Sequence, residues 1–333
     1  MPFASAQGAS PEERRAFTVT SQVSWALTAA LLLFVIGAIL TTSIEFRRGV
    51  LPLNAVVGPI FGLVGFVYIY LRFDITVAGP ADAIALAVIF TSVAAAYTYV
   101  MTYLGAGAPL WDARFAAADR ALGLDWRAYL AWLNERPVFG WALDQAYLSI
   151  LKQIPCLVVL LALLGQHRRL QIFILASQLC LIVCGAGGCF LPALGIYEFL
   201  NVSAAVDHPN IALATTDQHV AQVLQLRGPA PFIQLGEIEG IIVFPSFHMA
   251  LAVLFAWGFW GMPVVRWIAL ALNLAMAAAT PLSGGHYFVD LVAGAILAVA
   301  AIAAASALRN AIEGRVAGRP AAAPAFSRFG SSG

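Results

Sequence analysis

Two histidines of this 333-residue chain stand in strongly apolar sequence, where ionisable side chains are rare. His248 lies in GIIVFPSFHMALAVLF and His286 lies in TPLSGGHYFVDLVAGAIL. Asp290 follows His286 by four residues, a spacing that places two side chains one above the other on a helix. A lone histidine in a membrane helix often makes only an interhelical hydrogen bond. A histidine with a carboxylate neighbour is also suited to nucleophilic catalysis.

The residues around both histidines predict that each histidine lies at the start of a helix. Pro245 can occupy a first helical turn because it has no N–H to lose, and Ser246 and the free N–H groups of that turn then face the preceding loop. Residues 283–285, Ser-Gly-Gly, form a flexible approach that places His286 in the first turn of the last helix. Free N–H groups at a helix start bind phosphate readily. One further span separates the two helices, so both starts face the same side of a membrane.

This combination predicts phosphoryl transfer through a phosphohistidine. A neutral imidazole attacks phosphorus, while a carboxylate at its other nitrogen fixes the tautomer and stabilises the developing cation. A second, protonated histidine donates to the leaving oxygen. The route needs no cofactor and no metal. The alternative is a divalent cation held by His248, His286 and Asp290, for which the sequence offers no evident fourth ligand.

The composition places these residues in a membrane protein. Apolar residues make up 61% of the chain and charged residues 11%, and the mean hydropathy is +0.86. A soluble domain usually carries about 25% charged residues. These values exclude an ordinary soluble domain, a disordered chain and a nucleic-acid-binding protein. The net charge of +1 implies no bulk electrostatic partner.

Long apolar runs predict an all-α polytopic membrane bundle of about eight transmembrane helices with short interfacial helices. The expected spans are 23–44, 51–71, 83–104, 141–164, 170–197, 240–261, 267–282 and 286–308. Within 112–136, helical periodicity broken at Gly123 and Asp125 predicts two short interfacial helices.

We expect four segments along the chain. Residues 1–22 form a cytoplasmic N-terminal segment, and residues 23–104 form three transmembrane helices. Residues 105–308 form the catalytic membrane domain, and 309–333 form a disordered tail rich in Ala, Gly, Pro and Ser.

The loops predict the orientation of the chain and a possible lid. An even number of spans puts both termini on one side, and the arginines of loops 166–169 and 262–266 favour the cytoplasm for that side. The site then faces the outside, or the periplasm if this is a bacterial inner-membrane protein. The polar connection 198–239 is long enough to be a functional lid. Two histidines of this connection, His208 and His219, are expected to be exposed loop residues. Its glutamates Glu237 and Glu239 either recognise a hydroxylated acceptor or are solvated.

Two motifs in order resemble the signatures of a known family. FPSFH and GGHYFVD resemble the second and third motifs of the type 2 phosphatidic acid phosphatase superfamily. FPSFH with HYFVDL is more similar to its inositolphosphotransferase branch, which includes inositol phosphorylceramide synthase. PLWDARFAAADRALGLDW and QAYLSILKQ resemble bacterial members of that branch, and the resemblance covers about 108–305. It implies that His286 is the nucleophile and that Asp290 is its orienting carboxylate. It also implies that His248 is the general acid and that the Ser246 hydroxyl donates a hydrogen bond to phosphate.

The chain departs from the superfamily pattern where phosphate is usually clamped. Thr280 stands in place of the arginine that precedes the nucleophile, as in the transferase branch. The first motif is absent, because Lys152 is followed by Val159 and Leu160 where Arg-Pro is usual. Arg227, in QLRGPAPF, is the first substitute candidate for binding phosphate. Lys152 is the second, with an interfacial lysine as its alternative role.

These features favour a lipid head-group phosphotransferase whose partner is a membrane lipid with a phosphate-containing head group. The alternative with the same site is a phosphatase acting on phosphatidic acid or a polyprenyl diphosphate. A non-enzymatic transporter with a His and Asp proton relay is a third class. It would need polar residues spread over several spans, whereas here they cluster at one face.

Overall fold

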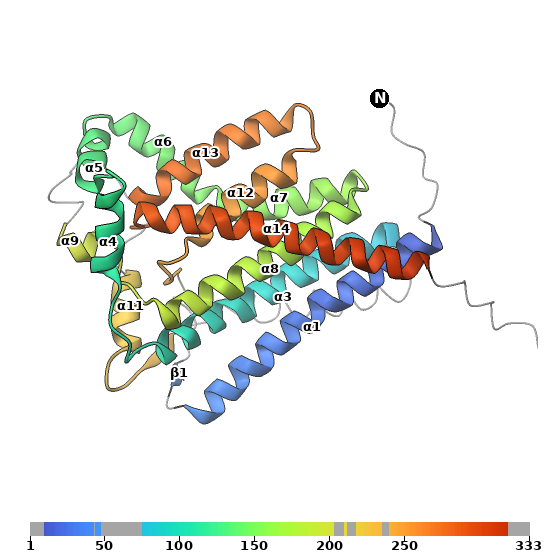
Figure 1. The fold of residues 1–333 in the computed structure, drawn as a ribbon, viewed down its shortest axis with the longest axis horizontal. Helices are drawn as coiled ribbons and strands as arrows, with labels where there is room; N and C mark the ends of the chain where they lie inside the picture. Colours follow the sequence, from blue (N-terminus) through green and yellow to red (C-terminus); the bar gives the residue numbers. More distant parts are fainter. Residues whose placement is uncertain are drawn as a thin grey trace, which may run out of the picture.

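The computed structural model describes residues 10–42, 44–47, 75–202, 210–211, 218–234 and 240–318. The expected span 51–71 lies outside these residues, as do His208, Glu237 and Glu239. In the described part, long helices run along one another, and short helices gather at one end of them (Figure 1).

The described residues confirm a helical membrane protein but not the count of about eight spans. Five helices are long and apolar enough to cross a membrane. They are α1 (Pro11–Thr41), α3 (Ile75–Leu104), α8 (His167–Phe190), α13 (Val265–Ser283) and α14 (Phe288–Ala317). The expected span 141–164 is instead two helices, α6 (Pro137–Leu148) and α7 (Ile150–Leu163), bent by 48°, and counts as a sixth if taken together. Helix α12 (Phe247–Phe259) has 13 residues, too few for a bilayer core about 30 Å thick.

Helix α1 begins before its expected span and α14 ends after its expected span, and local side-chain contacts explain both extensions. Helix α1 begins at Pro11 because Ser10 and Glu13 form a capping box, with the Glu13 N–H 3.1 Å from Ser10 Oγ. Helix α14 continues to Ala317, and Arg309 pairs with Glu313 one turn later at 3.1 Å. The prediction of a disordered tail from 309 onward was therefore wrong for residues 309–317.

The two short helices predicted within 112–136 are confirmed as helices. They are α4 (Asp112–Ala121) and α5 (Trp126–Asn134), and both lie at one end of the long helices (Figure 1). Gly123 breaks the run with a φ of +72°, and Asp125 caps α5 by accepting from the Ala128 N–H at 3.1 Å.

The connection between α8 and α12 is partly structured at the same end. It contains α9 (Ile196–Leu200), α11 (Gln218–Leu226) and β2 (Phe232–Gln234). Strand β2 pairs in parallel with β1 (Glu45–Arg47), a contact of three residues that the sequence did not predict.

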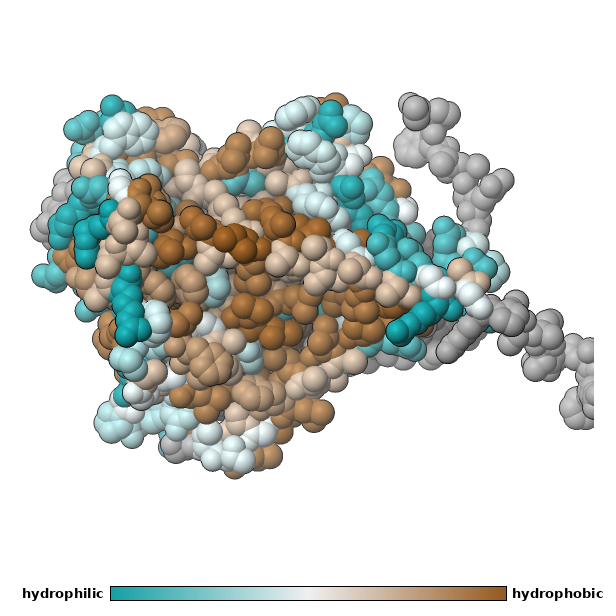
Figure 2. All heavy atoms as spheres, in the orientation of Figure 1, coloured by the Kyte–Doolittle hydropathy of each residue, from teal (hydrophilic) through white to brown (hydrophobic). Residues whose placement is uncertain are grey.

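The start of α1 and the end of α14 lie together at the end opposite α4 and α5 (Figure 1). An ion pair between Arg168 and Glu313 at 3.3 Å joins the start of α8 to the end of α14 there. Hydrophobic side chains occupy the middle of the visible face, and hydrophilic ones gather at its two ends (Figure 2). Such a band is typical of an integral membrane protein.

Helix α8 packs against α1, α3, α12 and α14. It therefore connects the N-terminal helices α1 and α3 to α12, which contains His248, and to α14, which follows His286. Buried polar contacts support this packing. Gln178 of α8 donates to the Ser24 carbonyl of α1 at 3.1 Å, and the Trp25 indole donates to Asp82 of α3 at 2.8 Å.

Candidate active site

His286 lies one residue before Tyr287, which caps α14, so it is outside the helix whose first turn it was predicted to join. The expected contact with Asp290 still forms, because the Asp290 side chain turns back toward the cap. Asp290 Oδ2 lies 3.3 Å from His286 Nδ1 and accepts the Tyr287 N–H at 2.9 Å. His286 is 4% exposed and Asp290 0%. With Nδ1 facing the carboxylate, Nε2 is the imidazole nitrogen left for chemistry.

Ser246 connects the start of α12 to His286. It caps α12, and its hydroxyl accepts the Met249 N–H at 3.3 Å and lies 3.5 Å from His286 Nε2. The Ser246 N–H donates to the Asp290 carbonyl at 3.1 Å. A Cβ at Gly294 would lie 2.3 Å from the Ser246 carbonyl oxygen, so this close approach of α14 requires glycine. Pro245 precedes the cap rather than occupying the first turn as predicted.

The two helix starts differ in the N–H groups that they offer, although both were expected to bind phosphate. At α14, Asp119 Oδ2 and Oδ1 accept the Phe288 and Val289 N–H groups at 2.9 and 2.8 Å. At α12, the Phe247 and His248 N–H groups have no protein partner among the residues that the structure describes. An anion can therefore be held by backbone donors at α12, while carboxylate already occupies the donors of α14.

His248, the second residue of α12, packs on Tyr147 of α6. The two rings stack with centroids 4.0 Å apart and planes 12° from parallel. The Tyr147 hydroxyl lies 3.3 Å from His248 Nδ1. A Cβ at Gly284 would lie 3.0 Å from that hydroxyl and 2.7 Å from His286 Cδ2. The hydroxyl of Tyr147 therefore lies beside Gly284, close to both histidines.

Sequence reasoning missed two buried carboxylates of α4. Asp112 Oδ1 accepts the Tyr287 hydroxyl and the Gly195 N–H, both at 2.9 Å, and Asp119 caps α14. Burial raises the pKa of the Asp119 carboxyl, and burial and the neighbouring Asp112 raise the pKa of the Tyr287 phenol. Two helical turns separate the carboxylates, and Phe115 and Ala116 are buried on the same face. That shared face was the available signal, but Arg114 and Arg120 make the same segment look like a solvated charged helix.

The two basic residues predicted to bind phosphate, Arg227 and Lys152, make no contact with either histidine among the described residues. Arg227 donates to the Gly105 and Ala108 carbonyls at 3.2 and 2.7 Å, at the end of α3. Lys152 is exposed on the first turn of α7. Within the described ranges, neither side chain has a polar contact with His248 or His286. Their role in phosphate binding stays a prediction.

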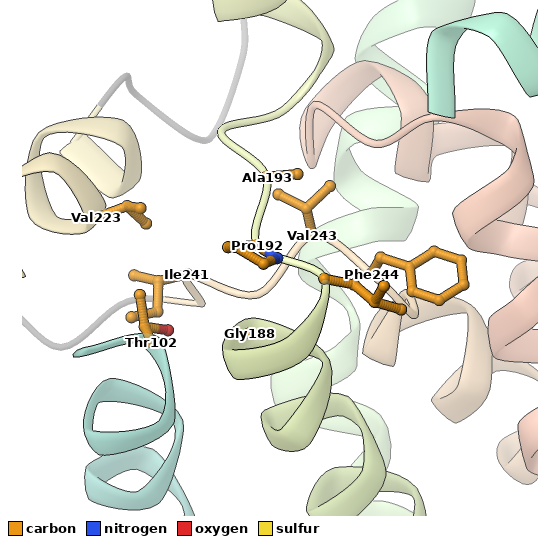
Figure 3. Close-up of a pocket in the computed structure, with 9 residues that line it drawn as sticks. Thr102, Gly188, Pro192, Ala193, Val223, Ile241, Val243 and Phe244 are labelled. Atoms are coloured by element: carbon orange, nitrogen blue, oxygen red, sulfur yellow. The ribbon is translucent and has the colours of Figure 1, made fainter. Parts of the chain in front are cut away.

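Two further features, the position of Thr280 and a small pocket, supply no positive charge that could bind phosphate. Thr280, which replaces the usual arginine, is fully buried and donates to the Met276 carbonyl of its own helix at 2.8 Å. A small pocket lies beside the segment that leads into α12 (Figure 3). Its side chains carry no charge and are apolar except for the Thr102 hydroxyl. The lining residues are Thr102, Gly188, Leu191, Pro192, Ala193, Val223, Ile241, Val243 and Phe244.

His219 was expected to be an exposed loop residue, and the structure corrects this. It lies on α11 and is half-buried. A Cβ at Gly195 would lie 3.7 Å from His219 Nε2 and 3.0 Å from the Gly285 carbonyl oxygen. The histidine thus packs close to the loop that carries His286.

A family model described as the PAP2 superfamily matches residues 113–304. The match includes Ser246, His248, His286 and Asp290, and it covers more than half of the chain. Comparisons with curated proteins and with solved structures gave no match.

Proposed function

The chain belongs to the PAP2 superfamily, a family of phosphatases and phosphotransferases, and from that premise we propose that it is a lipid phosphotransferase acting through a phosphohistidine on His286. The observation that carries the proposal is the contact between His286 Nδ1 and Asp290 at 3.3 Å, with Nε2 directed to the start of α12. The resemblance of FPSFH and HYFVDL to the inositolphosphotransferase branch supports a transferase within the same proposal. We assign the catalytic domain to residues 105–308, within which the family match lies.

In the first half-reaction, His286 Nε2 uses its lone pair to form a bond to phosphorus. The bond between phosphorus and the leaving oxygen breaks, and that oxygen keeps the electron pair and takes a proton from His248. Asp290 stabilises the positive charge that develops on the His286 ring. In this proposal the Phe247 and His248 N–H groups at the start of α12 and the Ser246 hydroxyl, 3.5 Å from His286 Nε2, donate to the phosphoryl oxygens.

In the second half-reaction, a hydroxyl attacks phosphorus and gives its proton to His248. The bond from phosphorus to Nε2 breaks, and its electron pair returns to His286. An acceptor lipid or polyol makes the protein a transferase. Burial of His286 and Ser246 favours that outcome, because a bound acceptor hydroxyl then competes with few water molecules.

Water as the acceptor makes the same site a lipid phosphatase, the second candidate. Membership of a family that includes phosphatases favours it. The two activities are separated by supplying purified protein in detergent with labelled phosphatidic acid, polyprenyl diphosphate or phosphatidylinositol, with and without ceramide. A new labelled lipid indicates the transferase, and free phosphate indicates the phosphatase. Absence of turnover on every substrate contradicts both.

The roles of the histidines are tested by rapid quenching and counting acid-labile phosphate on the protein. His286→Ala abolishes the phosphoenzyme under this proposal. His248→Ala still forms it from a nitrophenyl phosphate ester, whose leaving group needs no proton. Label trapped by His286→Ala but not by His248→Ala reverses the assignment.

A further inference from the structure

Both sequence neighbours of His286 are tied to segments that lie far from it along the chain. On one side, the Gly285 carbonyl accepts the Ile196 N–H at 2.9 Å. On the other side, the Tyr287 hydroxyl donates to Asp112 Oδ1, also at 2.9 Å. Tyr287 and Asp112 are both buried, which strengthens the hydrogen bond between them. The backbone that carries the proposed nucleophile is therefore held from two directions.

Asp112 connects these two supports. Besides the phenol, its carboxylate accepts the Leu194 and Gly195 N–H groups at 3.0 and 2.9 Å. Gly195 has a φ of +103°, which glycine adopts without steric cost, and the next residue, Ile196, is the donor to Gly285. One carboxylate of α4 therefore fixes both the turn that reaches Gly285 and the phenol on the other side of the histidine.

Resting on the proposed phosphoryl transfer, we propose that Asp112 is a positioning residue that sets the place of His286 relative to a phosphoryl group bound at the start of α12. His286 Nε2 lies 3.5 Å from the Ser246 hydroxyl of that helix start. Asp290 orients the imidazole through Nδ1, whereas Asp112 restrains the backbone on both sides of the ring. Misplacing a reacting group by about 1 Å can slow a reaction about 100-fold, so this restraint affects the rate directly.

Packing and hydrogen bonding contribute differently to the restraint. The Tyr287 ring lies among aromatic side chains, with its centroid 5.7 Å from that of Phe115 and 6.4 Å from that of Phe199. These contacts keep the ring buried with or without its hydroxyl. The Asp112 carboxylate adds direction, because a hydrogen bond to a charged acceptor is stronger and depends on angle. Its oxygens are already occupied by protein donors, so Asp112 orients His286 rather than contacting the substrate.

Two variants remove this restraint by different amounts. Asp112→Leu removes the acceptor, and we expect the rate constant of phosphoenzyme formation from a nitrophenyl phosphate ester to fall about 10- to 100-fold. The ester concentration that gives half of the maximal rate should stay within about twofold of the parent, because Asp112 does not contact the substrate. Tyr287→Phe keeps the buried ring and removes only the hydroxyl. Its rate constant should fall less, about 3- to 10-fold, since the turn at Gly195 keeps its acceptor.

The burst of nitrophenolate separates positioning from general support of the fold. A misplaced nucleophile reacts slowly in every folded molecule, so the burst keeps its amplitude while its rate constant falls. A loss of stability alone lowers the amplitude and leaves the rate constant of the folded molecules unchanged. Tyr97→Phe is the matched control, because this buried phenol donates to the Ile182 carbonyl of α8 at 3.0 Å and supports the packing of α3 on α8. Its rate constant should equal that of the parent.

A double mutant tests whether Asp112 acts through the phenol. We expect Tyr287→Phe to cause no further fall in an Asp112→Leu background, because the hydroxyl has already lost its acceptor. A reduced amplitude at an unchanged rate constant, a change in the half-saturating ester concentration alone, or additive losses in the double mutant overturns the inference and leaves the proposed function in place. If Asp112→Leu does not fold, Tyr287→Phe decides alone, and a rate constant within about twofold of the parent overturns the inference. A parent protein that forms no phosphoenzyme and gives no burst overturns the proposed function and this inference with it.

Discussion

Replacing Asp290 by asparagine isolates the contribution of one negative charge to the proposed nucleophile. In the structure a single oxygen, Oδ2, accepts from both His286 and Tyr287. An amide oxygen can occupy that place and keep both hydrogen bonds. The amide nitrogen then takes the place of Oδ1, which is buried and has no partner among the described residues. Asp290→Asn should therefore keep both hydrogen bonds and the histidine tautomer and lose the charge, while the buried amide N–H groups lower the free energy of unfolding by about 1–3 kcal/mol.

The separation of the two groups sets the size of the effect. A full unit charge on His286 at 3.3 Å from the carboxylate gains about 5 kcal/mol at an effective dielectric constant of about 20. The transition state carries part of that charge, so we expect a loss of about 3–4 kcal/mol. At about 1.4 kcal/mol for each factor of ten, phosphoenzyme formation slows by about 10²- to 10³-fold.

The assay is rapid-quench trapping of labelled phosphate, together with thermal unfolding to check that the protein stays folded. Asp144→Asn is the control. Asp144 is also a buried carboxylate at this end of the molecule. One of its partners is the Ser283 hydroxyl, which donates to Oδ1 at 2.8 Å and can donate to an amide oxygen in the same way. We expect the control to lose less than about tenfold. A rate for Asp290→Asn within tenfold of the parent, in a folded protein, would refute the electrostatic role of Asp290.

Three further predictions test the surroundings of the site. Arg227→Ala should lower kcat/KM by about 10²- to 10³-fold if the side chain holds phosphate, and activity within a factor of two of the parent would pass that role to Lys152. Asp119→Ala should lower the free energy of unfolding by about 1–2 kcal/mol, because two N–H groups at the start of α14 lose their acceptor, and a denaturant melt that matches the parent would contradict this. Leu122→Cys, at an exposed position beside α4, should react in a cysteine-free background with an impermeant thiol reagent added outside intact cells; labelling only after the cytoplasmic face is opened would reverse the proposed orientation.

The membrane character and the interfacial helices could be predicted because they depend on local composition and periodicity. The break at Gly123 is one case, since glycine tolerates the positive φ found there and Asp125, two residues later, is a common helix-capping residue. The contact between His286 and Asp290 was predicted correctly, but the predicted geometry was not. Helical spacing suggested it, whereas the structure achieves it with His286 outside the helix and Asp290 folded back onto the cap.

Features that depend on distant segments could not be read from the sequence. The run 141–164 is long enough for one span, yet the structure bends it by 48° between α6 and α7, and Tyr147, near the end of α6, stacks on His248 of α12. Asp112 and Asp119 contact residues near position 290 across long loops, and nothing local distinguishes such acids from solvated ones. The spacing of the two carboxylates could suggest a shared face, but not what that face contacts.

The unequal helix starts imply a direction of approach for the phosphoryl group. Carboxylates occupy the first N–H groups of α14, and the added negative charge there disfavours a phosphate. The start of α12 offers its Phe247 and His248 N–H groups and the Ser246 hydroxyl. Under the proposed mechanism, a phosphoryl group held at the start of α12 would present phosphorus to His286 Nε2, which lies 3.5 Å from the Ser246 hydroxyl. In-line attack would then direct the leaving oxygen away from the start of α14. The proposed acid, His248, belongs to the helix that would hold the phosphoryl group, whereas the proposed nucleophile, His286, is held by Asp290 of α14.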